Sequence, residues 1–133
     1  MFMITAVLAV YLSGMAQSGS PGKPDSPLGN WRGMSVCQVK PSGCNDEDSL
    51  YHFKAIAGKS DEFELQADKI VDGKPITMGT GPCSYNAKGQ LACPIAESGA
   101  ILIFEVKGNE MSGTMTLANG TLWRKLTLKK VRD

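Results

Sequence analysis

Four turn-forming pairs divide the second half of the chain at short intervals: Asp72-Gly73, Lys88-Gly89, Gly108-Asn109 and Asn119-Gly120. Each pair lies between short runs that are apolar or that alternate apolar and polar residues. Asn-Gly and Asp-Gly favour tight hairpins because both residues tolerate positive φ. Alternation with a period of two is typical of strands that bury one face. The chain therefore predicts an all-β fold in which hairpins join consecutive strands.

Consecutive hairpins without a long crossover fit an eight- to nine-stranded antiparallel up-and-down barrel. Closing a sheet into a barrel removes its exposed edges, which otherwise promote aggregation. A two-sheet β-sandwich is the alternative fold. The expected strands are residues 29–39, 49–57, 62–71, 75–79, 82–86, 90–95, 100–107, 110–118 and 121–131.

The segment 46–58 fits two secondary structures. Its apolar residues also have a helical spacing, acidic residues stand at its start, and Gly58 is placed as a C-terminal cap. Tyr51, Phe53 and Ala55 alternate along the chain, as in a strand that buries one face. We favour the strand.

Charge and motif content exclude several classes of function. Lys and Arg number 14 against 13 Asp and Glu, the formal net charge is +1, and no basic run is longer than Lys129-Lys130. Nucleic-acid binders concentrate basic residues, so we expect no nucleic-acid partner. The sequence has one histidine and lacks the nucleophile-elbow, zinc-protease, P-loop and dinucleotide motifs. We therefore expect no enzyme and no cofactor.

The first 16 residues have the features of a secretory signal peptide. Residues 1–12 are apolar apart from Thr5, and the small residues Gly14 and Ala16 precede a cleavage site at Gln17. This run is too short to cross a bilayer of roughly 30 Å as a helix, so we expect no membrane anchor. Residues 17–27, rich in Gly, Ser and Pro, predict a flexible leader before a domain at 28–133. The mature protein is expected to be secreted or periplasmic.

The four cysteines predict two local disulfides. If a hairpin turns through residues 87–89, Cys83 directly faces Cys93, close enough for a bond. Cys37 and Cys44 flank a short turn between the first two strands. A redox pair would favour C-x-x-C spacing, which neither pair has. Zinc would need convergent thiolates or histidines, so we expect no metal site.

Two motifs stand at the ends of the expected barrel: Gly29-Asn30-Trp31 in the first strand and Arg124 in the last. The chain thereby resembles the lipocalin-like (calycin) barrels, in which G-x-W opens the first strand and a basic residue of the last strand packs over the tryptophan. The resemblance implies structural roles for Gly29 and Trp31, with Arg124 over Trp31 at the closed end. Arg124 is also in phase with Leu126, and a guanidinium on an apolar face needs stacking or hydrogen-bond acceptors.

A barrel of this size encloses either side chains alone or one small ligand. Gly33 and Ser35 share a face with Trp31, and Gly113 shares one with Met111, so small inward residues would leave room. We expect a small hydrophobic ligand, and a filled barrel without a ligand is an alternative. The residues expected to line the pocket are Trp31, Tyr51, Phe53, Leu65, Phe104 and Met115.

A protein partner is the other alternative. The chain is close in size to small exported members of this barrel group, such as avidin-like proteins and bacterial inhibitors of secreted metalloproteases, and is similar to small bacterial exported proteins without an assigned function. A mobile leader at 17–27 ahead of a rigid barrel is an arrangement that suits an inhibitor of an extracellular protease. An inert spacer is the simpler interpretation of the same segment.

The titratable residues give weaker signals. His52 alternates with Tyr51 and Phe53, so it is expected to face solvent if those two face inward. The acidic run 46–48 follows a turn and lacks the alternating spacing of a calcium loop, so solvated carboxylates are expected. Asn119 begins a glycosylation motif, but Asn-Gly at a hairpin has its own backbone reason.

Overall fold

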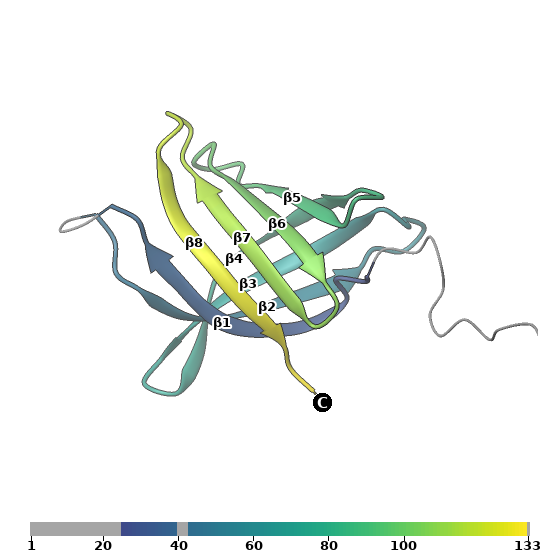
Figure 1. The fold of residues 1–133 in the computed structure, drawn as a ribbon, viewed down its shortest axis with the longest axis horizontal. Coiled ribbons are helices and arrows are strands. Elements are labelled where there is room, and N and C mark those ends of the chain that lie inside the picture. Colours follow the sequence, from purple (N-terminus) through teal and green to yellow (C-terminus); the bar gives the residue numbers. More distant parts are fainter. Residues whose placement is uncertain (1–24, 40–42, 133) are drawn as a thin grey trace, which may run out of the picture.

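The computed structural model describes residues 25–39 and 43–132, which form a closed antiparallel barrel (Figure 1). Each strand pairs with the next along the chain, and β1 also pairs with β8. The barrel is therefore confirmed, and the sandwich alternative is wrong. The predicted signal peptide at 1–16 lies outside the described residues. The strands are β1 (Gly29–Cys37), β2 (Glu47–Ala55), β3 (Glu62–Val71), β4 (Lys74–Tyr85), β5 (Gln90–Pro94), β6 (Ile101–Lys107), β7 (Glu110–Thr116) and β8 (Leu122–Lys130).

Tight turns join the strands where the sequence predicts them. Asp72 and Gly73, between β3 and β4, have φ values of 51° and 77°. Two consecutive positive φ angles match the twist of the flanking strands. Between β7 and β8, the Asn119 side chain accepts a hydrogen bond from the Thr121 amide at 3.0 Å. Asn119 thus has a structural role in its turn.

The strand count differs from the expectation at one place. The expected strands 75–79 and 82–86 are a single strand, β4, so the barrel has eight strands. The expected break falls at residues 80–81, but β4 stays paired with β3 through these residues. A bulge between Ala67 and Asp68 takes up the extra residue of β4. Segment 46–58 contains strand β2, so the favoured strand is confirmed. No helix in the described residues is long and apolar enough to cross a membrane.

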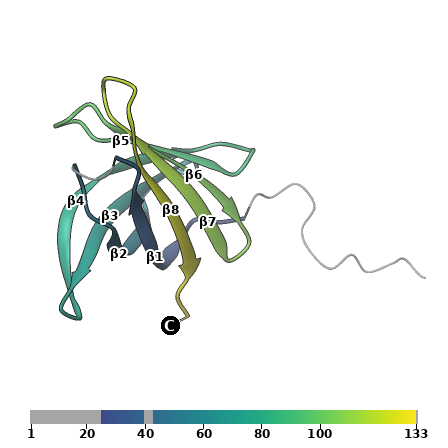
Figure 2. The same ribbon diagram turned by 60° about the vertical axis from the view of Figure 1, so that its left-hand side comes forward.

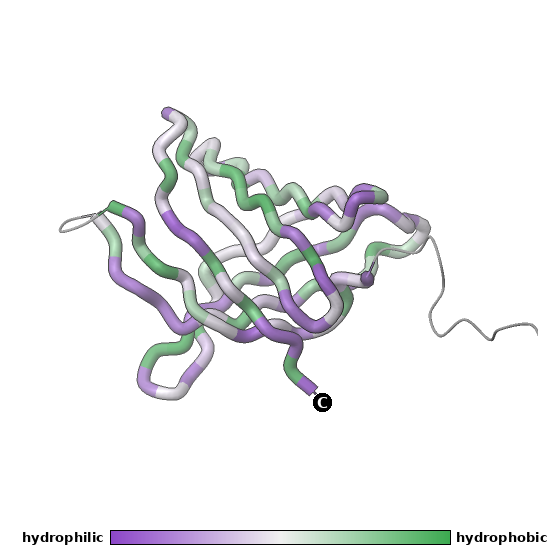
Figure 3. Tube along the Cα trace, viewed as in Figure 1, coloured by the Kyte–Doolittle hydropathy of each residue, from purple (hydrophilic) through white to green (hydrophobic). Residues whose placement is uncertain are grey.

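The hydrophobic core fills the barrel interior. Alternating residues of the strands face inward, and the hydropathy along the chain follows them, with β6 largely apolar (Figure 3). The core residues share exposures below one tenth and include the following: Trp31, Tyr51, Phe53, Phe63, Leu65, Leu91, Leu102, Phe104, Val106, Met111, Leu126 and Leu128. Burial of this apolar surface is the main favourable term in folding.

The closed end of the barrel is the end with loops 56–61, 86–89 and 108–109, where the chain enters at residues 25–28. There the Trp31 indole N–H donates to the carbonyl of Pro27 at 2.8 Å, and Pro27 is fully buried. The Gly108 amide donates to the Asp25 carboxylate at 2.6 Å, and the Tyr85 hydroxyl donates to the Asp25 carbonyl. Residues 25–27, expected in the leader, thus pack on the barrel because the buried indole needs an acceptor.

The open end of the barrel is the opposite end, with segments 38–39 and 43–46 and loops 72–73, 95–100 and 117–121. β4 pairs with β5 at two positions, Ser84 with Ala92 and Tyr85 with Leu91. The rest of β4 pairs with β3 alone, and residues 71–80 are exposed. Two views show the β3–β4 hairpin pointing away from the β7–β8 loop (Figures 1 and 2). The inner face of this hairpin is therefore accessible.

Both predicted disulfides are confirmed. Cys83 in β4 is bonded to Cys93 in β5, with their Cα atoms 4.3 Å apart. Cys37 is bonded to Cys44, with a Cα–Cα distance of 5.5 Å. The first bond joins the two strands that share the fewest pairing positions, and the second closes the loop after β1. Two disulfides fit an oxidising location for the protein.

Candidate functional site

The residues expected to line a ligand pocket pack against one another. Tyr51 and Phe53 each meet the ring of Phe104 edge to face, with centroids 5.9 and 5.8 Å apart. Trp31 and Leu65 belong to the same buried cluster, and Met115 packs against it from the open side. The sequence thus identified residues that come together. Protein side chains occupy the space among them.

Two of the small inward residues leave no room. A Cβ atom added at Gly113 would overlap the ring of Phe104, and one added at Gly33 would overlap the carbonyl of Thr127. Gly113 therefore makes space for a neighbouring ring, and Gly33 allows β1 and β8 to approach closely. Gly79 in β4 is different, because a Cβ there would meet no atom within 4 Å. Unfilled space on the inner face lies beside β4.

Polar residues line the inner face of β2 toward the open end. Glu47, Ser49 and Tyr51 alternate along the strand and share this face. The Ser49 side chain is fully buried, and its Oγ atom has no hydrogen-bond partner in the part of the chain that the structure describes. Ser49 lies opposite Lys69 of β3, and Tyr51 lies opposite Ala67. A buried hydroxyl without a partner costs free energy, so Ser49 is a candidate for a contact that the described chain does not supply.

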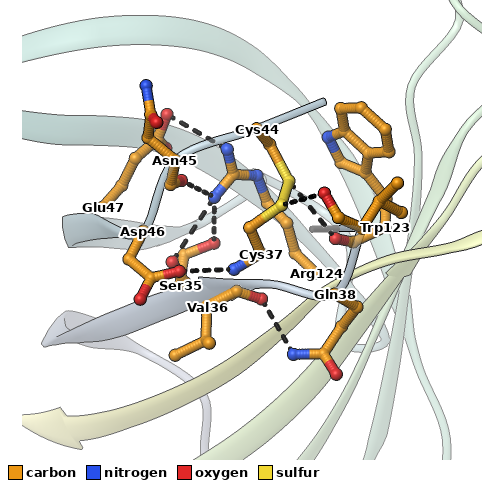
Figure 4. The surroundings of a disulfide bond; sticks show 11 residues. Ser35, Val36, Cys37, Gln38, Cys44, Asn45, Asp46, Glu47, Trp123 and Arg124 are labelled. Atoms are coloured by element: carbon orange, nitrogen blue, oxygen red, sulfur yellow. Dashed lines mark hydrogen bonds and ion pairs between the residues drawn. A yellow bond between two sulfur atoms is a disulfide. The ribbon is translucent and has the colours of Figure 1, made fainter. Parts of the chain in front are cut away.

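Arg124 lies at the open end, not over Trp31. Its guanidinium donates to the Asn45 carbonyl at 2.8 Å and to Ser35 Oγ at 3.2 Å, and it pairs with Glu47 Oε1 at 3.3 Å (Figure 4). The Arg124 side chain is 11% exposed and that of Glu47 is 23% exposed. The guanidinium thus finds the acceptors that its apolar face lacks. Its charge is balanced by Glu47.

Lys130 is the basic residue beside Trp31. Its Nζ atom lies 5.6 Å from the centroid of the Trp31 ring, and the two residues are opposite each other on β8 and β1. Arg124 is opposite Cys37, at the other end of β1. The expected pairing of Arg124 with Trp31 is therefore wrong, because the register places a later basic residue of β8 at the closed end. Gly29 opens β1 with a φ of 119° and lies beside Lys130.

Burial raises the pKa of Tyr51 to about 12, with a further contribution from the Glu47 carboxylate and an opposing one from Arg124. Tyr51 therefore stays protonated at all physiological pH values, and its hydroxyl can donate a hydrogen bond.

The acidic run 46–48 does not form one site. Asp46 accepts a hydrogen bond from the Cys37 amide at 2.9 Å, Glu47 pairs with Arg124, and Asp48 pairs with Arg32 at 2.8 Å. The hydrogen bond from Arg32 lowers the pKa of Asp48. The described residues include no cluster of three or more potential metal ligands. The three carboxylates serve separate contacts.

His52 lies on the outer face of β2, as expected, but in a hydrogen-bonded network. Its ring nitrogens lie 2.6 Å from Asn30 Oδ1 and 3.0 Å from Asp68 Oδ2. Asp68 is 3% exposed and accepts a further bond from Thr77 at 2.8 Å. Burial acts to raise the pKa of Asp68, but hydrogen bonds from Thr77, Gln66 and His52 together lower it. His52, with a side chain 20% exposed, is therefore a structural link across four strands rather than a free surface residue.

Ser49 and His52 lie on opposite faces of the same strand, so they form no nucleophile–base pair. The inner face at the open end instead presents hydrogen-bond donors beside open space. Sequence reasoning missed Ser49, Lys69 and Gly79 as candidate residues. The signal for Ser49 was present, since a serine stands in phase with Tyr51 and Phe53. The space beside Gly79 depends on the missing β5 partner, which no local pattern shows.

Comparison with known proteins bears on the fold. No protein-family model matches the chain, and no curated protein matches it. Among solved structures, the chain is similar to secretory abundant heat soluble protein 4 from Ramazzottius varieornatus, with a TM-score of 0.50 and 18% sequence identity. The match covers 86% of this chain and 100% of that one. At this identity the likeness extends to the small barrel fold alone.

Proposed function

We propose that this protein is an exported, non-catalytic binding protein of lipocalin-like barrel type that holds a small ligand at its open end. The observation that carries the proposal is the Ser49 hydroxyl, which is fully buried and has no hydrogen-bond partner among the described residues. Leaving such a group unpaired costs about 1–3 kcal/mol. A ligand that reaches Ser49 from the open end recovers this free energy.

The open end supports the proposal because it combines access with donors. Residues 71–80 are exposed, and the space next to Gly79 is unfilled. We place the ligand on the inner face of β2, β3 and β4, which we call the open-end site, defined by Ser49, Tyr51, Lys69, Ile76 and Gly79. The aromatic core beneath it serves as the floor, since its rings already contact one another. This position replaces the expected pocket among the core residues.

Two observations support export. Both disulfides join residues near in sequence and fit an oxidising compartment. The similar solved protein carries the description secretory, abundant and heat soluble. We propose that the mature chain is secreted or periplasmic.

Native mass spectrometry of the mature protein, purified from its own host, tests the ligand. We expect a bound small molecule on the wild type and its loss from Ser49→Ala, which keeps the fold because it removes an unpaired hydroxyl. Ser112→Ala is the matched control, since Ser112 is an exposed serine of β7. An unliganded wild type, together with an unchanged melting temperature across a panel of small amphiphiles, would overturn the proposal.

An extracellular protein partner is the alternative function. The observation in its favour is the exposed β3–β4 hairpin, where Ile76 and Met78 are 46% and 45% exposed. For inhibition of an extracellular protease by the leader, the useful truncation removes residues 17–24 and keeps Asp25 to Pro27, which close the barrel. Loss of inhibition would support this alternative, and equal inhibition by both forms would exclude a role for the leader.

A further inference from the structure

We infer that the ligand of the open-end site carries an anionic group on an apolar body, with the anion held by Lys69, Ser49 and Tyr51. This inference rests on the proposed function and adds the chemical class of the ligand. It follows from the charges and donors that face the site. It also follows from the exposed side chain of Ile76 and the open space at Gly79 beside them.

Lys69 brings a positive charge to the site. It is opposite Ser49 on β3, and residues opposite each other on a sheet share a face, so both side chains leave toward the interior. Lys69 is half-buried and, within the described part of the chain, forms no ion pair. Its charge is therefore not balanced by a protein carboxylate.

The other polar groups at the site are also able to donate. The Ser49 hydroxyl has no partner, and among the described residues the hydroxyl of Tyr51 makes no hydrogen bond. Glu47, the nearest inward carboxylate on β2, is already paired with Arg124 at 3.3 Å. The inner face of β2 and β3 thus carries three donors, one of them charged, and its nearest carboxylate is already paired. Carboxylate, sulfonate and phosphate oxygens fit this set.

The apolar part of the site lies next to the donors. Ile76 of β4 is opposite Lys69, and Gly79 is opposite Ala67, so one face of β3 and β4 offers an alkyl side chain and open space. Two strand spacings separate β2 from β4, a span of about 10 Å. A body the size of a two-ring aromatic or a short alkyl chain covers this span.

A matched pair of fluorescent probes tests the charge. 1-Anilinonaphthalene-8-sulfonate and N-phenyl-1-naphthylamine share the same rings and differ by the sulfonate. We expect the sulfonate to bind the wild type about tenfold more tightly than the neutral probe, the effect of one charge pair. Lys69→Met should abolish that difference and leave the neutral probe's affinity unchanged. Lys54→Met, an exposed lysine of β2, is the control and should change neither affinity.

A second variant locates the binding. Gly79→Val places a side chain in the open space, where an added Cβ atom meets nothing within 4 Å, and should weaken both probes at least about tenfold while the near-ultraviolet circular dichroism stays native. If both probes bind the wild type equally and Lys69→Met has no effect, the inference of an anionic ligand is wrong, but the location of the open-end site is not contradicted. If neither probe binds, or Gly79→Val leaves both affinities unchanged, the open-end site itself is wrong.

Discussion

The two ends of the barrel solve the same packing problem in different ways. At the closed end, the chain before β1 covers the interior, and the buried Trp31 indole has its acceptor at Pro27. At the open end, β4 runs beyond its partner β5, and Gly79 faces open space. The Ser49 hydroxyl there has no hydrogen-bond partner within residues 25–39 and 43–132. The closed end is completed by the chain itself. The open end has polar groups and space that the described chain does not fill.

The difference separates residues that stabilise the fold from residues available for binding. Phe104 touches Tyr51 and Phe53 and occupies the space over Gly113, so its role is packing. Within the described residues, the side chains of Ser49 and Lys69 form no hydrogen bond or ion pair, yet both face the barrel interior. Substitutions of packing residues should therefore lower the stability of the fold. Substitutions of Ser49 or Lys69 should weaken binding and leave stability unchanged.

The largest effect is expected in the filled region. Phe104→Ala removes a fully buried ring and should lower the free energy of unfolding by about 3–5 kcal/mol. Urea denaturation followed by tryptophan fluorescence measures the change. A loss below about 1 kcal/mol would mean that the interior is loosely packed and would break the contrast between the ends.

Two inward glycines sharpen the contrast directly. Gly113→Ala pushes a methyl group into Phe104 and should cost about 1–3 kcal/mol. Gly79→Ala meets no atom within 4 Å and should leave the free energy of unfolding within about 0.5 kcal/mol of the wild type. The same denaturation assay compares the two variants. Equal losses would show that the space beside Gly79 is filled.

The stability of the protein at alkaline pH tests whether the Tyr51 hydroxyl is buried. Its pKa is raised from 10.0 to about 12 in the folded protein, so its contribution to stability is complete below pH 10 and is lost as pH rises toward 12. The loss should reach about 2 kcal/mol. Unfolding of the wild type, Tyr51→Phe and Tyr85→Phe between pH 8 and 12 measures it. A Tyr51→Phe curve identical to the wild type would contradict the burial.

The smallest effect is expected on the outer surface. Arg32 and Asp48 form an exposed ion pair at 2.8 Å, with side chains 55% and 37% exposed. Water and salt screen such pairs, so Arg32→Ala should not change the melting temperature measurably. A clear decrease in the melting temperature at low salt that disappears at high salt would show that this surface ion pair stabilises the fold.

Local sequence patterns predicted the turns and the disulfides of this molecule. The residues of the candidate site depend on packing between distant segments. The turn at Asp72-Gly73 and the facing of Cys83 with Cys93 follow from a few neighbouring residues, and the structure confirms both. The packing of the Phe104 ring over Gly113 was not predictable in this way. It depends on the pairing of β6 with β7 and on the orientation of the ring, which no local pattern indicates.

The misassigned partner of Trp31 has the same cause. Arg124 and Lys130 are both inward candidates on β8, and the register with β1 decides which one reaches the ring. That register is continuous from the pair of Trp31 with Lys130 to the pair of Cys37 with Arg124, and it joins residues about 90 positions apart in the sequence. The open-end site depends likewise on where β5 ends. No sequence feature near Ser49 indicates the length of β5.

Amide hydrogen exchange with and without 1-anilinonaphthalene-8-sulfonate tests the central claim most directly, because it locates binding at one end of the barrel. We expect slower exchange in segments 47–51, 67–71 and 76–81, with the closed-end segments 25–31 and 106–110 unchanged. Protection confined to the closed end, or none at saturating probe, would contradict the assignment of binding to the open end.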